Sequence, residues 1–219
     1  MKKLLFLTLS FCVFAMSAQN NEGKFAIEKG TWNISGNLSI EASNSTTERS
    51  ENTTNFESSN SGFSFTPSVS YFLSNNLSIG LAVGYGYFEN ENTNGINQNL
   101  QFRNQYSIAP TIKKLFPVGK NFAFSLKGEL GYMHSKSNTS DGAYRLSQNT
   151  YSMTLRPGID FFVTKKLALQ ANIGALQYRN MNSKSDNSIN PSAYSKGNSQ
   201  TFNFNLNSAN ILFGLSYYL

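Results

Sequence analysis

The sequence predicts an all-β fold in which eight antiparallel strands form an up-and-down meander that closes into a barrel. Three observations predict it. Beyond Gly30, apolar and polar residues alternate with period 2 almost throughout, with no helical period. The connections between the expected strands alternate between short and long. The polar faces carry the small residues and the charges, which suits a narrow interior. The 219 residues are enough for one or two domains.

Residues 1–18, MKKLLFLTLSFCVFAMSA, have the form of a secretory signal peptide. Lys2 and Lys3 supply the positive start, and an apolar run follows that is too short for a membrane-spanning helix, which needs about 20 residues. Small residues then precede the expected cut after Ser17 or Ala18. We therefore expect a signal peptide over 1–18, a short N-terminal leader over 19–29 and the barrel over 30–219.

The only cysteine, Cys12, lies inside this signal, so the mature chain has no thiol for disulfides or cysteine metal sites. The bulky Phe11 before it disfavours lipidation. Without Lys2 and Lys3 the charge is 16 Lys+Arg against 12 Asp+Glu, or +4. No dense basic stripe accompanies it, so we expect no nucleic-acid partner.

The strand with the clearest pattern is NLSIGLAVGYGYF, Asn76–Phe88, where Ile79 and Leu81 alternate with Gly80 and Ala82. The same alternation marks each of the others. The eight expected strands are, in order, Trp32–Glu41, Phe63–Leu73, Asn76–Phe88, Leu100–Ile112, Phe122–Tyr132, Tyr151–Phe161, Leu167–Gly174 and Ile211–Leu219.

Each strand pairs an apolar side with a polar one. The apolar sides begin, strand by strand, with Trp32 and Ile34; Phe63 and Phe65; Leu77 and Ile79; Leu100 and Phe102; Phe122 and Phe124; Tyr151 and Met153; Leu167 and Leu169; and Ile211 and Phe213. The opposite sides are rich in Gly, Ser and Ala. In the last strand the parity changes between Leu206 and Ile211, which predicts a bulge near Ser208 with TFNFNL continuing above the membrane.

Tight turns at LSNNL, FPVGKN and VTKKL alternate with long polar segments such as ENENTNGINQN and RNMNSKSDNSINPSAYSKGNS. Short periplasmic turns and long extracellular loops are the asymmetry of an outer-membrane barrel. A repeat supports the hairpin unit: PSVSYFL, PTIKKLF and PGIDFFV share one pattern, and FGLSYYL matches it at the C-terminus. The prolines keep the strand parity, although proline cannot donate to a ladder.

The apolar faces of the strands indicate whether the barrel lies in water or in lipid. Eight strands of exposed Phe, Leu, Ile and Tyr exceed the apolar surface that a soluble monomer tolerates, whereas lipid accepts it and a closed barrel satisfies every backbone group. We therefore predict a transmembrane barrel with apolar side chains outward. Aromatic residues near the strand ends predict interfacial girdles: Trp32, Tyr71, Tyr87, Tyr132, Tyr151, Phe161, Tyr217 and Tyr218.

The signal peptide, the alternating strands and the aromatic last strand resemble the OmpA/OmpX-like small outer-membrane β-barrels of Gram-negative bacteria, over roughly Gly30 to Leu219. Gly214, Tyr217 and Leu219 resemble the C-terminal signal of that family, which implies the barrel assembly machinery as a partner. The resemblance also implies outer-membrane lipid and lipopolysaccharide as surroundings and a monomer. With strand 8 at the end, we expect no periplasmic domain.

Charged residues in the middle of the polar faces are the one group of side chains for which the sequence predicts specific contacts. Hairpin geometry should bring Lys127, Glu129 and Arg156 together, with Asp160 below, because unpaired charges in a narrow lumen are costly. Arg103 and Glu41 lie on the same face. We interpret these six residues as a structural polar network that fills the lumen, and the alternative is the selectivity lining of a narrow pore.

No catalytic, cofactor or metal site is expected. His134 is the only histidine, and a hydrolase resembling the lipid A deacylases would need Ser135 or Ser137 and an acid within reach of it. One histidine and scattered carboxylates do not make a transition-metal site, although Ca²⁺ at Glu48, Glu51, Glu89 and Glu91 stays open. We therefore expect no enzyme.

The functional expectation is a structural role in the envelope, or a surface interaction with a protein partner through the outer loops. The TFNFNL edge is a candidate for capturing a partner strand. A narrow pore for ions or small solutes is the alternative, and an outer-leaflet lipid-modifying enzyme is a third possibility with less support.

Overall fold

The computed structural model describes residues 26–47, 56–94, 97–142, 144–187, 194–205 and 211–219, and the predicted signal peptide and the bulge near Ser208 lie outside them. Ten strands are present: β1 (Trp32–Thr47), β2 (Phe56–Ser74), β3 (Leu77–Asn94), β4 (Asn97–Pro117), β5 (Phe122–Thr139), β6 (Tyr144–Phe162), β7 (Leu167–Ile173), β8 (Ala175–Asn187), β9 (Ser195–Asn205) and β10 (Ile211–Tyr218). No helix among these residues is long and apolar enough to cross a membrane.

The strands confirm the all-β, eight-stranded antiparallel barrel with an up-and-down meander. At the short-turn end the ring runs β1 to β7 in sequence order, then to β10, and β10 pairs with β1 from Asn33–Tyr218 to Gly36–Leu215. β7 corresponds to the predicted seventh strand, whereas β8 lies in the segment that was predicted as the long connection after it. β9 and β10 flank the region where the eighth strand was predicted to change parity. The closed ring therefore consists of eight strands, β1–β7 and β10, and β8 and β9 extend the sheet at the outer end.

Much of the predicted loop length continues the ladder instead. β1 and β2 pair as far as Thr47–Phe56, and β3 and β4 pair as far as Asn94–Asn97, so most of ENENTNGINQN is strand. The predicted long loop RNMNSKSDNSINPSAYSKGNS likewise lies within the span of the β8–β9 hairpin, which is paired from Ala175–Asn205 to Ser185–Ser195. Polar residues keep the extended backbone here because cross-strand hydrogen bonds, rather than apolar packing, hold them.

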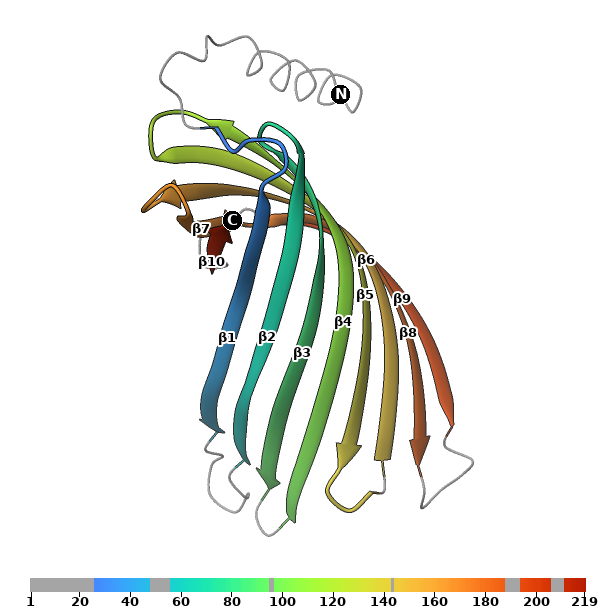
Figure 1. Ribbon diagram of the computed structural model, residues 1–219. Helices are drawn as coiled ribbons and strands as arrows, with labels where there is room; N and C mark the ends of the chain where they lie inside the picture. The colour runs from blue at the N-terminus through green and yellow to red at the C-terminus, as the bar shows by residue number, and fades with distance from the viewer. Residues whose placement is uncertain (1–25, 48–55, 95–96, 143, 188–193, 206–210) are drawn as a thin grey trace, which may run out of the picture.

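The outer half of the barrel has an open seam. β8 pairs with β6 and β9 pairs with β8, but within the described residues no pairing joins β9 to the outer part of β1. Figure 1 shows β7 and β10 turning away from β8 and β9, and it shows β1 and β9 at opposite borders of the sheet. Gly174, with a φ of 67° that favours glycine, lies between β7 and β8 where this turn occurs.

Proline positions in the sheet now have a physical explanation. Each lies where the ladder to one neighbour is interrupted: between Phe65–Tyr85 and Ser68–Ala82 at Pro67, and between Ile108–Tyr132 and Thr111–Glu129 at Pro110. At Pro157 the β6 register changes from β8 to β7. Proline has no N–H, so it is tolerated where the neighbouring strand offers no carbonyl for a ladder hydrogen bond.

Apolar side chains face outward, as predicted. Ile79, Leu81 and Val83 of β3 are each nearly half exposed in the isolated chain, at 46, 46 and 47%. The inward side of the same strand carries small residues, and a Cβ at Gly80 would lie 2.6 Å from the Val69 carbonyl oxygen of β2. Glycine is favoured there because the backbone of the neighbouring strand approaches closely.

An apolar cluster closes the interior at the short-turn end. Phe72, Leu115, Phe162 and Tyr218 are each at most 3% exposed, and Ile27 of the leader joins them with Ala123 and Ala168. The Tyr218 ring lies 6.0 Å from Phe72 and 5.5 Å from Phe162 between centroids. Tyr218 was predicted in the girdle, but it follows the inward parity of Ser216 and packs inside the barrel.

Hydrogen bonds attach the leader to this end. The Ile27 N–H donates to Asn76 Oδ1 at 2.8 Å, the Asn76 N–H donates to the Ile27 carbonyl at 2.9 Å, and the Gly30 N–H donates to the Phe72 carbonyl. Asn76 adopts a φ of 64°, which asparagine tolerates in a tight turn. The leader therefore covers the apolar cluster from the short-turn end. We call this apolar cluster the floor of the lumen.

Candidate functional site in the lumen and on the outer face

Three of the predicted lumen residues form one chain of ion pairs. Glu129 of β5 accepts from Arg156 Nε at 3.0 Å through Oε2, and its Oε1 lies 3.4 Å from Lys127 Nζ. Lys127 and Arg156 are directly opposite each other in the β5–β6 ladder, which explains why one carboxylate reaches both. The three side chains are 19–25% exposed, so water still reaches this level of the lumen.

Asp160 lies below this group and pairs with a residue that the sequence reasoning missed. Its Oδ1 is 2.5 Å from Lys113 Nζ, and the Asp160 side chain is fully buried. Lys113 continues the inward parity of Thr111 on β4 by one more step, so extending the alternation would have found it. Asp160 Oδ2 is buried without a hydrogen-bond partner among the described residues, so Lys113 compensates this charge.

Arg103 and Glu41 lie higher, in an upper hollow of the lumen. This hollow encloses about 430 Å³, and its lining includes both residues with Asn60 and Gln148. The Arg103 guanidinium stacks over the Phe88 ring at 4.5 Å from the centroid, and none of the ion pairs among the described residues includes Arg103. The six predicted residues therefore form three separate groups rather than one network.

His134 and the serines beside it face opposite sides of β5. His134 Nδ1 lies 2.8 Å from Asn149 Oδ1, on the outward face, whereas Ser135 and Ser137 are buried on the inward face. Successive residues of a strand point to opposite faces, so this result follows from local geometry. A serine–histidine pair is thus not assembled at this position.

The described residues contain no group of three or more His, Cys, Asp or Glu side chains placed to hold a metal ion. Of the four acids considered for Ca²⁺, Glu48 and Glu51 lie outside the described residues, and Glu91 lines a hollow of the outer half with Glu57. The expectations about cofactors, metals and catalysis stay predictions.

Gly214, Tyr217 and Leu219 lie in or just after β10, the strand that closes the ring. Tyr217 pairs with Ile34 of β1 and points outward, and the Leu219 N–H donates to the Trp32 carbonyl. A Cβ at Gly214 would lie 2.6 Å from Asn37 Oδ1, so the glycine leaves space for that inward side chain. Their role in assembly stays a prediction.

Comparison with known proteins identifies the family of the chain. The family profile described as "Outer membrane protein beta-barrel domain" matches residues 5–217. Among solved structures, the outer membrane protein OprG from Pseudomonas aeruginosa is similar at a TM-score of 0.49 and 11% identity, over 91% of this chain and 99% of that one. A search of curated proteins found no match.

The profile covers nearly the whole chain, including every described strand except Tyr218, the last residue of β10. It agrees with the outward apolar faces, the inward charges and the antiparallel ring, each of which a lipid environment requires. This protein belongs to the outer membrane protein β-barrel domain family and is an outer-membrane protein.

Proposed function

We propose that this protein is a non-conducting outer-membrane barrel that serves envelope integrity or surface interaction through its outer sheet. The observation that carries the proposal is the floor of the lumen. Phe72, Leu115, Phe162 and Tyr218 pack against each other there, with Ile27 beneath them. A solute or ion crossing the barrel would have to displace this apolar packing, which costs several kcal/mol.

The size of the outer sheet supports the same proposal. A strand needs about 9–11 residues to cross the bilayer, whereas β4 has 21 residues and β2 and β6 have 19 each. The surplus lies at the long-loop end and is rich in Ser, Thr and Asn. These polar hairpins protrude well beyond the lipid and present a large hydrogen-bonding surface.

The open seam gives that surface a specific mode of recognition. β9 and the outer part of β1 each have one pairing edge without a strand partner among the described residues. Free N–H and C=O groups on such an edge are a template for an added strand. A protein segment in extended conformation is therefore the surface partner that we expect.

A deletion strain tests the role. We expect increased sensitivity to detergents or loss of adhesion, restored by the wild-type gene. A variant whose β1–β2 hairpin is shortened to the Glu41–Gly62 pair should still fold, because it retains the ring, but it should fail to restore the phenotype. Heat-modifiable migration on a gel verifies folding. Full restoration by the shortened variant would contradict a role for this hairpin.

A narrow pore is the second candidate, and the upper hollow of about 430 Å³ with Arg103 and Glu41 in its lining favours it. Purified protein in planar bilayers separates the two. We expect no single-channel steps from the wild type, and discrete steps that scale with protein concentration would overturn the proposal in favour of the pore.

A further inference from the structure

Outward side chains on β5, β6, β8 and β9 are arranged in rows across the four strands. The ladder pairs Lys136 with Ser147, Ser147 with Lys184, and Lys184 with Lys196, so these residues form one row near the outer end. Arg145 and Asp186 form part of the next row, closer to the loops. Three lysines and an arginine therefore gather on one outward face of the barrel.

These cations line a hollow of about 490 Å³. Its charged lining is Lys136, Arg145 and Lys184 against the single carboxylate of Asp186, a net charge of +2. Lys196 adjoins it with its Nζ 5.4 Å from the centre of the Tyr194 ring. The ion pairs found among the described residues all lie in the lumen, and none of them involves these outward cations. We call this hollow the cationic pocket.

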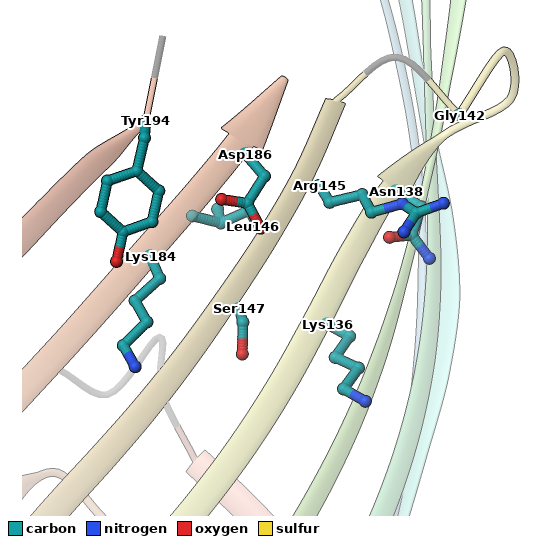
Figure 2. Close-up of a pocket in the computed structure, with 9 residues that line it drawn as sticks. All are labelled: Lys136, Asn138, Gly142, Arg145, Leu146, Ser147, Lys184, Asp186 and Tyr194. Atoms are coloured by element: carbon teal, nitrogen blue, oxygen red, sulfur yellow. The ribbon is translucent and has the colours of Figure 1, made fainter. Parts of the chain in front are cut away.

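Figure 2 shows the residues that line the cationic pocket and the strands that carry them. The side chains of Lys136 and Lys184 extend away from the turn at Gly142, toward the part of the barrel that lies in the membrane. The positive charge of the pocket is thus presented toward the lipid headgroups rather than toward the tips of the hairpins.

A second hollow lies below the first on the same face. It has a volume of about 600 Å³, and Leu130, Met153, Tyr178 and Phe202 contribute apolar side chains to its lining. These four residues are also one row of the ladder. Gly128 leaves the wall bare, and the interrupted β4–β5 pairing at Pro110 lies beside it. We call it the apolar hollow.

The spacing of the two hollows corresponds to a lipid molecule. Lys136 is six residues along β5 from Leu130, or about 20 Å at the rise of a strand. Between them lie the Tyr132–Tyr151 pair, with ring centroids 5.3 Å apart, and then the His134–Asn149 contact. Tyrosines mark the membrane–water interface, so the apolar hollow lies at the depth of acyl chains and the cationic pocket at the depth of headgroups.

We propose that this face binds one molecule of lipopolysaccharide, with an acyl chain in the apolar hollow and phosphate groups on Lys136, Lys184 and Arg145. A net charge of +2 matches a lipid that carries more than one phosphate, whereas a phospholipid with one phosphate would leave the pocket partly unneutralised. The proposal depends on the orientation of the barrel in the outer leaflet, and it holds whether or not the lumen conducts.

The test uses the folded mature protein in nanodiscs of phosphatidylcholine and measures binding of fluorescent lipopolysaccharide. The double variant Lys136→Gln with Lys184→Gln should bind at least about 10-fold more weakly, equivalent to about 1.4 kcal/mol. The matched control is Lys165→Gln with Lys166→Gln, two exposed lysines in the short turn between β6 and β7. The control should bind as the wild type does, and equal binding by all three proteins would overturn the site.

Two competitors separate the parts of the ligand. Lipopolysaccharide without its phosphates should compete poorly if the cationic pocket contributes, and deacylated lipopolysaccharide should compete poorly if the apolar hollow does. Phosphatidylglycerol that competes as well as intact lipopolysaccharide would overturn the assignment, since the face would then recognise any anionic lipid. Because the readout is lipid binding, it is independent of the conductance and complementation tests of the proposed function.

Discussion

The two ends of this barrel solve the same backbone problem in different ways. At the short-turn end, the ring is closed by β10 against β1 and is filled with apolar side chains. At the outer end, long polar hairpins pair with each other, but within the described residues they leave a seam between β9 and β1. A closed ring must satisfy its backbone without water, whereas a sheet that extends into water can leave an edge open because solvent hydrogen-bonds it.

This comparison teaches where stability and function reside. The Lys113–Asp160 ion pair and the apolar floor lie in the closed half, and each removes a group from water or fills a gap. The outer half is held by repeated weak contacts, such as Ser59 Oγ donating to Asn44 Oδ1 at 2.9 Å on exposed strands. We therefore expect substitutions to lose effect on stability from the floor outward.

The largest expected effect is at Asp160. Asp160→Ala leaves the Lys113 ammonium buried without its partner, so we expect a loss of about 3–5 kcal/mol in the free energy of unfolding. Urea titration in lipid vesicles measures it. The double variant Lys113→Met with Asp160→Leu should recover most of the loss, because no charge then remains. A loss below about 1 kcal/mol for Asp160→Ala alone would show that this pair is not sealed from water.

Phe162 tests the floor by a different mechanism. Phe162→Ala creates a cavity among Leu115, Tyr218 and their neighbours, and we expect a loss of about 3 kcal/mol. The adjacent Phe161→Ala is the control: its side chain is 47% exposed and faces outward, where acyl chains fill the space that the ring leaves. Equal losses from the two variants in urea titration would break the contrast between packed floor and lipid-facing wall.

Glu129 sharpens the comparison in the middle of the lumen. Glu129→Ala removes the shared partner of Lys127 and Arg156, but water reaches these side chains, so the expected loss is about 1 kcal/mol. The unfolding transition in urea measures it, and planar bilayers should stay silent. An altered single-channel current with unchanged stability would instead identify Glu129 as the lining of a pore.

Ser59 gives the smallest effect. Ser59→Ala deletes one exposed hydrogen bond of the β1–β2 hairpin, and we expect a change within about 0.5 kcal/mol. Heat-modifiable migration and urea titration should match the wild type. A loss as large as that of Phe162→Ala would mean that the outer sheet carries the stability of the barrel, which reverses the comparison between the ends.

Period-2 alternation was sufficient to predict which side chains face lipid. Leu81 and Lys127 lie on the predicted faces, because a strand allows only two directions for a side chain and one of them is buried. The same rule extended by one step would have found Lys113. The partner of Asp160 was missed because it comes from β4, two strands away, and the sequence does not state how strongly the ring curves.

The floor shows a different limit. Phe72, Leu115 and Phe162 have inward parity, but in the sequence they read only as apolar residues near strand ends, and Tyr218 was interpreted as a girdle residue. Their meeting depends on closure of the ring, which brings strands far apart in the sequence to one point. The cationic pocket was missed for the same reason, since Lys136, Arg145 and Lys184 are separated by up to 48 positions.

By itself, the sequence determined the fold class, the tight turns at one end of the barrel and the long polar segments at the other, the outward direction of the apolar residues and the outer-membrane location. These are local properties, because strand parity and turn length are written in neighbouring residues. Only the tertiary structure decided which charges pair, that the lumen has an apolar floor and that β1 and β9 leave a seam. Those outcomes depend on register and curvature summed around the ring, and no single segment contains that information.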